Sequence, residues 1–125
     1  MSEAKAPTIL VVEDEEIVRE VVCMDLVDAG FAVREAATGD EAIRILQDES
    51  GGDQIAVLFT DIRMPGSLDG WSLAEWARAL KPDLQVLYAS GYSTEPAREV
   101  PGSLFISKPY RTTLLLEMIR RFQAY

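Results

Sequence analysis

The sequence predicts a single layered α/β domain built on a parallel β-sheet. Apolar runs of five or six residues recur along the 125-residue chain, and segments with helical periodicity separate them. Runs rich in β-branched and aromatic residues are typical of the buried strands of a parallel sheet. Four of these runs also end on a polar residue, which points to one functional edge of the sheet.

The N-terminal part of the chain predicts two strand–helix units. Thr8–Val12 is an apolar first strand, and Glu15–Ala29 has the spacing of an amphipathic helix. Phe31–Ala36 alternates as a second strand, and Thr38 then caps a helix that extends to about Glu49. The residues expected to face the core are Val18, Val21, Val22 and Leu26 in the first helix and Ala42, Ile45 and Leu46 in the second.

Three further units complete the predicted domain, residues 1–125. The strands expected here are Ile55–Thr60, Gln85–Ala89 and Ser103–Ser107. Gly70–Leu80 keeps helical spacing until Pro82 closes it, and Ser93 begins a short helical piece that Pro101-Gly102 ends. The expected core residues are Leu73, Trp76, Ala77 and Leu80 in the third helix and Leu115, Met118, Ile119 and Phe122 in the last.

The amino-acid composition argues against several classes of function. Lys and Arg number 12 against 21 Asp and Glu, for a net charge of −9, which argues against direct binding of nucleic acid. No apolar run approaches the roughly 18 residues of a membrane span, and the start MSEAKAP lacks the apolar core of a signal peptide, so we expect a cytoplasmic protein. The absence of histidine nearly excludes zinc sites and Ser-His catalysis, and Cys23 is expected to be structural.

Polar residues that suit phosphate chemistry follow four of the predicted strands. They are Glu13, Asp14, Asp61, Ser90 and Lys108. Because the carboxyl ends of parallel strands meet at one edge of a sheet, we expect these side chains to share a pocket. At about 5 Å and an effective dielectric near 20, each pair of carboxylates repels by roughly 3 kcal/mol. Magnesium, which takes oxygen ligands, would relieve that repulsion.

Each of these residues has a simpler interpretation when taken alone. Asp61 can attack a phosphoryl donor and form an acyl phosphate, but an isolated Asp is more often a turn or helix-capping residue, and Asp14 could cap the first helix. Ser90 alone would be a turn residue, and Phe105 would belong to the core. Lys108 is expected to pair with Asp61 at rest, and the proline that follows it makes a cis peptide bond feasible.

In combination, these residues resemble the receiver domain of two-component response regulators. The resemblance covers essentially the whole chain and rests on Glu13-Asp14, Asp61 with Met64-Pro65-Gly66, Asp69-Gly70, Ser90-Gly91 and Lys108-Pro109, in that order. It implies a flavodoxin-like, doubly wound (βα)5 fold whose five-stranded parallel sheet has the order 2-1-3-4-5. Met1 and the polar start favour a stand-alone, single-domain regulator over an excised domain.

The resemblance also implies a function. A histidine kinase or a histidine phosphotransfer protein would donate a phosphoryl group to Asp61, and the chain would catalyse only its own phosphorylation and dephosphorylation. The implied ligands of Mg2+ are Asp14, Asp61, the backbone carbonyl of Arg63 and, through water, Glu13. The implied catalytic residues are Asp61, Lys108 and Ser90, and the implied switch pair is Ser90 and Phe105.

Three departures from the family pattern shape the expected partners. The loop from Met64 to Gly70 is one residue longer, with Leu68 expected in the place of a buried methionine, and Trp71 replaces a smaller aliphatic residue. The segment between Ser90 and Lys108 is shorter by about one helical turn, ~4 residues. A short helix there would leave too little surface for the usual receiver dimer. We therefore expect a mainly monomeric protein that binds a downstream protein target or passes the phosphoryl group to a histidine.

Other functions are less consistent with the sequence. A phosphatase-like hydrolase that uses an aspartyl phosphate usually needs a second acid two residues after the nucleophile, where this chain has Arg63. A degenerate receiver that only binds a partner would not need the complete polar set. A flavin-binding domain of the same topology would carry a Ser/Thr/Gly-rich phosphate loop after the first strand, and this chain has none there.

Overall fold

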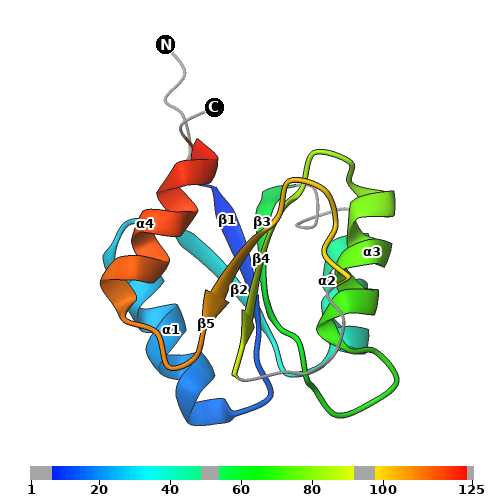
Figure 1. Cartoon of the computed structure of the whole chain (residues 1–125), viewed down its shortest axis with the longest axis horizontal. Coiled ribbons are helices and arrows are strands. Elements are labelled where there is room, and N and C mark those ends of the chain that lie inside the picture. The colour runs from blue at the N-terminus through cyan, green and yellow to red at the C-terminus, as the bar shows by residue number, and fades with distance from the viewer. Residues whose placement is uncertain (1–6, 49–53, 92–97, 124–125) are drawn as a thin grey trace.

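The structure, a computed structural model, describes residues 7–48, 54–91 and 98–123 (Figure 1). These residues form five strands and four helices. In chain order the elements are β1 (Thr8–Val12), α1 (Glu16–Asp28), β2 (Ala32–Ala36), α2 (Gly39–Gln47), β3 (Ile55–Asp61), α3 (Gly70–Leu80), β4 (Gln85–Ser90), β5 (Leu104–Ser107) and α4 (Thr112–Gln123). None of the described helices is long and apolar enough to cross a membrane.

The five strands form one parallel sheet in the order β2-β1-β3-β4-β5, which confirms the predicted topology. Helices α1 and α4 cover one face of the sheet, and α2 and α3 cover the other (Figure 1). After β1 the chain crosses to β2 on one side, and after β3 it crosses to β4 on the other side. The connections therefore change direction between β1 and β3, and the carboxyl ends of strands at such a point are where open α/β sheets bind ligands.

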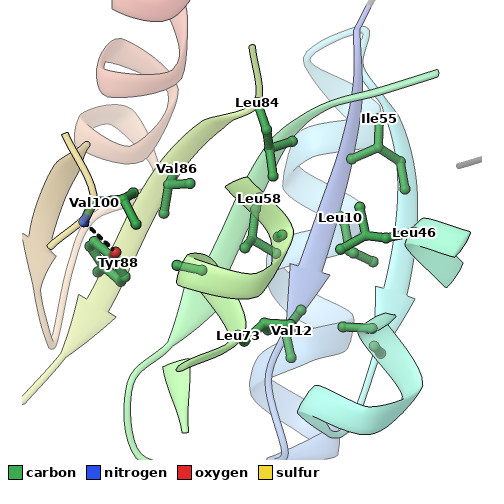
Figure 2. Close-up of a cluster of buried hydrophobic side chains, with 14 of the residues drawn as sticks. Leu10, Val12, Leu46, Ile55, Leu58, Leu73, Leu84, Val86, Tyr88 and Val100 are labelled. Carbon is green, nitrogen blue, oxygen red and sulfur yellow. Dashed lines mark hydrogen bonds between the residues drawn. The ribbon is translucent and has the colours of Figure 1, made fainter. Parts of the chain in front are cut away.

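Each face of the sheet carries its own buried cluster, because successive strand residues point to opposite faces. On β1, Leu10 and Val12 face α2 and α3, whereas Ile9 and Val11 face α1 and α4. Figure 2 shows the first cluster, in which residues of β1, β3 and β4 meet Leu46 of α2 and Leu73 of α3. This packing on both faces explains why the strands are nearly continuous apolar runs.

Most of the helix residues that were predicted to face the core do so, and two do not. Val21 is 52% exposed and Leu80 is 45% exposed, so neither belongs to the core. In α1 the buried positions are Val22, Cys23 and Leu26, which confirms the structural role expected for Cys23. Helix α1 is apolar on two sides, and periodicity alone cannot decide which side faces the sheet. Leu80 is the last residue of α3, where the helix leaves the sheet.

The interpretation of Phe105 as a core residue was also wrong, because its side chain is 39% exposed and does not belong to either buried cluster. Phe105 lies on β5, the edge strand of the sheet, opposite Tyr88 of β4. An edge strand has a neighbour on one side only, and the described residues leave this side chain partly uncovered.

Leu68 is half-buried, and a side chain at Gly39 would collide with it, at 2.8 Å from its Cβ.

The connection between β4 and β5 differs from the expected short helix. Residues 93–97 of that helix lie outside the described residues, and residues 98–100 are not helical. The described part is fastened to the rest of the fold by hydrogen bonds. Val100 N donates to the buried Tyr88 hydroxyl at 3.1 Å, as Figure 2 shows, and Arg78 Nη1 donates to the Pro101 carbonyl at 2.6 Å. Arg98 forms an ion pair with Glu75 of α3 at 2.7 Å.

Capping residues define two of the helix starts. Thr38 accepts a hydrogen bond from Glu41 N at 3.1 Å, as predicted, and Asp69 accepts one from Ser72 N at 2.8 Å. Asp14 does not cap α1, because the N-cap position is Glu15 and no side chain caps it. The capping interpretation of Asp14 is therefore excluded.

Candidate functional site

Three carboxylates meet at the carboxyl ends of β1 and β3. Glu13 and Asp14 follow β1, and Asp61 is the last residue of β3. One carboxylate oxygen from each lies within 4.8 Å of the others. Glu13 is only 5% exposed, Asp61 is half-buried and Asp14 is exposed. The cluster is thus open to solvent on the side of Asp14 and closed on the side of Glu13.

Lys108 supplies a positive charge to this cluster. It follows β5, and its Nζ donates to Asp61 Oδ2 at 2.9 Å and to Glu13 Oε1 at 3.0 Å. The bond to Asp61 is the one expected from the sequence, whereas the bond to Glu13 was not foreseen. The Lys108–Pro109 peptide bond is cis. Three carboxylates against one ammonium leave the cluster with an excess of negative charge.

The pKa values of the clustered groups reflect burial first and this excess of negative charge second. Burial raises the pKa of Asp61 to about 6; the hydrogen bond from Lys108 opposes this rise, and repulsion from Glu13 and Asp14 adds to it. Burial and the neighbouring Glu13 also raise the pKa of Asp14. Burial acts to lower the pKa of Lys108, but its hydrogen bonds to Asp61 and Glu13 outweigh that effect and raise it. A hard cation bound by oxygen ligands would meet the unbalanced charge, so the donor set fits Mg2+.

Backbone groups hold the carboxylates in place. Asp61 Oδ1 accepts a hydrogen bond from Ile62 N at 3.1 Å, and Glu13 Oε2 accepts one from Glu15 N at 3.1 Å. Gly70 N donates to the Ile62 carbonyl at 2.7 Å. A side chain at Gly70 would collide with the Asp61 carbonyl and lie 2.7 Å from Ile62 Cα, so the close return of the loop beside Asp61 requires glycine.

The remaining predicted site residues occupy different positions around the cluster. Ser90 is buried at the end of β4, next to β3, and its carbonyl accepts a hydrogen bond from Lys108 N at 2.8 Å. Arg63 is exposed and lies two residues after Asp61. Phe105 lies on β5, and its position opposite Tyr88 places it two residues from Ser90 along the register of the two strands.

Sequence reasoning missed Arg19 of α1. Its Nη1 donates to the Glu13 carbonyl at 2.8 Å, and its Nε donates to Glu35 of β2 at 2.9 Å. A signal for this contact exists in the sequence, because a strand–helix–strand unit brings the first turns of its helix to the carboxyl ends of its strands. An Arg in that part of α1 and a Glu at the end of β2 therefore satisfy the geometry of a pair.

A groove of about 560 Å³ borders the cluster. It runs between α1 and the segment that follows β5, and Lys108 is part of its wall. Its apolar lining comes from Ile17, Val18, Val21, Val22, Pro109 and Tyr110, and its polar lining from Glu15, Asp25, Lys108 and Thr112. Thr112 Oγ1 donates to Asp25 at 2.6 Å across the groove, which joins α4 to α1.

Comparison with known proteins identifies the family. The family model of the response regulator receiver domain matches residues 9–120. The response regulator receiver protein CpdR of Brucella abortus is 31% identical over 117 residues, which are 90% of this chain and 93% of CpdR. The sensor kinase CckA of Brucella abortus is 32% identical over 90% of this chain, but the match spans only 12% of CckA. The match to DctD of Rhizobium meliloti, also 32% identical, spans 25% of that regulator and 93% of this chain.

Solved structures give the same result. A response regulator receiver protein from Sinorhizobium medicae has a TM-score of 0.85 and 32% identity, and the match covers 94% of both chains. The receiver domain of the hybrid histidine kinase CckA has a TM-score of 0.78 and 37% identity, with 92% of this chain and 97% of that domain covered. The response regulator TrrA of Thermotoga maritima, solved in complex with Mg(2+)-BeF, has a TM-score of 0.80 and 26% identity over 93% of this chain and 98% of TrrA.

These matches do not favour the phosphatase-like hydrolase or the degenerate binding module. Receiver domains interact with histidine kinases and with downstream partners, and they are not enzymes in the ordinary sense. The fold, the acidic cluster and the match over residues 9–120 lead to one conclusion: the chain belongs to the receiver domain family of two-component response regulators.

Proposed function

We propose that Asp61 accepts a phosphoryl group from a phosphohistidine on a partner protein. The observation that carries this proposal is the position of the Asp61 carboxylate at the end of β3, 2.9 Å from Lys108 and within 4.8 Å of two further acids. A carboxylate oxygen attacks phosphorus, the bond between phosphorus and the imidazole nitrogen breaks, and an acyl phosphate forms on Asp61. The released imidazole keeps the electron pair of that bond.

The charge of the transferred group is met by the residues around Asp61. Lys108, already beside Asp61, would pair with a phosphoryl oxygen, and Ser90 would donate its hydroxyl to another. Asp14, Asp61 and the backbone carbonyl of Arg63 would hold Mg2+, with Glu13 helping through water. When bound, magnesium neutralises negative charge on the carboxylates and on the phosphoryl oxygens. The only reactions expected of the chain are gain and loss of its own phosphoryl group.

The switch would pass from Ser90 to Phe105. Ser90 ends β4 and Phe105 lies on the neighbouring β5, so a shift of Ser90 toward a phosphoryl group acts beside Phe105. The partly exposed ring of Phe105 can then change its position without disturbing either buried cluster. A downstream protein that contacts β5 would sense that change.

The phosphodonor would be a histidine kinase or a histidine phosphotransfer protein that docks on the groove beside Lys108. A histidine presented to Asp61 must lie above Lys108, so the protein around it covers the neighbouring rim. That rim includes an exposed apolar row on α1, in which Ile17 is 77% exposed and Val21 and Met24 follow at helical spacing. An apolar helix surface of the donor would bury this row.

Phosphorylation can be tested directly by intact-mass analysis after treatment with acetyl phosphate and magnesium. The wild type should gain one phosphoryl group, and Asp61→Asn should gain none while its circular dichroism stays native. Asp83→Asn is a matched control, because Asp83 is exposed in the turn before β4, at the opposite end of the sheet. Full labelling of Asp61→Asn would show that another residue accepts the phosphoryl group.

We also propose that the protein stays mainly monomeric when phosphorylated. The described part of the β4–β5 connection is fastened to α3 and to Tyr88 of β4, and it contributes no helix beside β5. Light scattering at micromolar concentration, with and without beryllofluoride as a phosphoryl mimic, tests this. The expected mass is that of one chain in both conditions, and a shift to a dimer with the mimic would contradict the proposal.

A further inference from the structure

The guanidinium of Arg19 joins three parts of the fold. Arg19 belongs to α1, its Nη1 bonds the carbonyl of Glu13 at the end of β1, and its Nε bonds the Glu35 carboxylate of β2. The helical hydrogen bonds of α1 begin further along the chain, where Arg19 N donates to the Glu15 carbonyl at 2.9 Å. The Glu13 carbonyl therefore receives its donor from a side chain, at the point where the chain passes from strand to helix.

The two bonds hold the guanidinium firmly. The Arg19 side chain is only 16% exposed, although Glu35 is largely open to solvent. A guanidinium is planar, so two bonds from Nε and Nη1 define both its place and its orientation. The hydrogen bond that Arg19 donates to Glu35 also raises the pKa of Arg19. Glu35 thus serves as a fixed anchor for Arg19 on the neighbouring strand.

The bond to Glu13 has a direct consequence for Asp14. The Glu13 carbonyl and the Asp14 N–H belong to one planar peptide group, so a donor on that carbonyl fixes the plane from which the Asp14 side chain departs. Asp14 is the exposed member of the acidic cluster, whereas the Glu13 carboxylate is already held by Lys108 and by Glu15 N. The orientation of Asp14 toward Asp61 then depends on this peptide plane.

We propose that Arg19 is a positioning residue of the magnesium site, and that it orients Asp14 through the Glu13 carbonyl. This inference rests on the proposed function, in which Asp14 and Asp61 hold Mg2+. Arg19 acts through its hydrogen bond to the Glu13 carbonyl, which lies 2.8 Å from Arg19 Nη1. Side chains that orient the ligands of a metal without touching the metal typically contribute roughly tenfold or more to metal affinity.

The test is calorimetric titration of Mg2+ into the wild type and four variants. Arg19→Met removes both bonds and should weaken Mg2+ binding roughly tenfold. Arg19→Lys keeps the charge but cannot bridge both acceptors, so it should fall between the wild type and Arg19→Met. Glu35→Gln loosens the anchor and should cause a smaller loss. Arg44→Met removes an equal charge from the exposed face of α2 and should leave the affinity unchanged.

Two further measurements separate positioning from general stability. The free energy of unfolding in urea, measured without magnesium, reports the stability of each variant. A variant that is only less stable would show a lower free energy of unfolding and an unchanged Mg2+ affinity. The loss in Arg19→Met should persist when the salt concentration is raised, because a short hydrogen bond is screened less than a distant charge. If Arg19→Met does not fold, Arg19→Lys and Glu35→Gln decide the outcome in its place.

The results distinguish this inference from the proposed function. A folded Arg19→Met or Arg19→Lys that binds Mg2+ as tightly as the wild type would overturn the positioning role and leave the acidic site intact. A wild type that does not bind Mg2+ would overturn both. Labelling of Asp61 by acetyl phosphate reports separately on the phosphoacceptor.

Discussion

The two faces of the sheet are closed in different ways. On the side of α2 and α3, the β4–β5 connection is tied down by Tyr88, Arg78 and Arg98, and buried rings of Trp71 and Tyr88 lie 4.7 Å apart. On the side of α1 and α4, apolar residues remain exposed on α1, and a groove leads from them to Lys108. The first face is thus closed at the β4–β5 connection by contacts within the chain, whereas the other leaves a row of apolar residues that a partner can bury.

The strongest test of this difference between the two faces is to truncate one apolar side chain on each of them. Leu73→Ala on α3 should lower the free energy of unfolding by about 3 kcal/mol, because Leu73 is fully buried. Met24→Ala on α1 should change it by less than about 0.5 kcal/mol, because the Met24 side chain is largely in solvent. Urea unfolding without magnesium measures both, and equal losses would refute the distinction between the two faces.

Removal of a single hydroxyl on each side gives a finer test. Tyr88→Phe leaves the buried Val100 N–H without its acceptor and should cost about 1–2 kcal/mol of unfolding free energy. Tyr110→Phe, whose ring contacts Phe59 edge-on beside the groove, should cost less than about 0.5 kcal/mol. The same urea titrations apply. A loss in Tyr88→Phe no larger than that in Tyr110→Phe would mean that Tyr88 does not hold the connection.

At the acidic cluster, Asp61→Asn should stabilise the magnesium-free protein, by on the order of 2 kcal/mol at pH 7. The folded pKa of about 6 exceeds the ordinary value of 3.8, so ionisation of Asp61 costs stability. That cost is absent below about pH 4, grows as the pH rises, and is complete above about pH 7. Thermal or urea unfolding from pH 4 to pH 7.5 should show the gap between variant and wild type open over this range.

Magnesium should narrow the stability gap between the wild type and Asp61→Asn. The wild type should gain roughly 1.4 kcal/mol at ten times the dissociation constant, by mass action, whereas Asp14→Ala and Asp61→Asn should gain little. Melting temperatures with and without magnesium measure the gain. A wild-type melting temperature indifferent to millimolar magnesium would count against an intact acidic site.

The groove beside Lys108 can be tested as the surface on which the phosphodonor docks. Ile17→Glu should slow phosphotransfer from a cognate histidine kinase roughly tenfold, equivalent to about 1.4 kcal/mol, because a charge interrupts the apolar row on α1. Labelling by acetyl phosphate, which needs no docking surface, should be unchanged. Leu80→Glu, at an exposed position on the opposite face, is the control. If Ile17→Glu slows both donors equally, the change acts on the chemistry and not on docking.

Much of the fold and the core of the site could be predicted from the sequence, for a physical reason. Buried parallel strands are apolar on both faces, so their ends are easy to find, and the parallel arrangement brings Glu13, Asp14, Asp61 and Lys108 together once the strands are known. The sheet order followed from the family resemblance and agrees with the structure.

The rest depended on contacts between distant parts of the chain. The choice between the two apolar sides of α1 depends on what the sheet offers, so Val21 was assigned to the wrong side. Phe105 has a large apolar side chain of the kind usually buried in a core, but the edge position of β5 leaves that side chain partly exposed. The bridge from Arg19 to Glu35 joins residues 16 positions apart and carries no local pattern.

Several contacts that hold the loops end on main-chain atoms. Arg78 donates to the carbonyls of Leu84 and Pro101, Tyr88 accepts from Val100 N, and Arg19 donates to the Glu13 carbonyl. The main-chain atom stays in place when the side chain of its residue changes, so the bond depends on the side-chain partner alone. In a saturation mutagenesis experiment, Arg78 should therefore tolerate little, while Pro101, whose side chain is exposed, should tolerate more. Pairwise covariation would not reveal these contacts, because no substitution at the main-chain partner can compensate for the lost side chain.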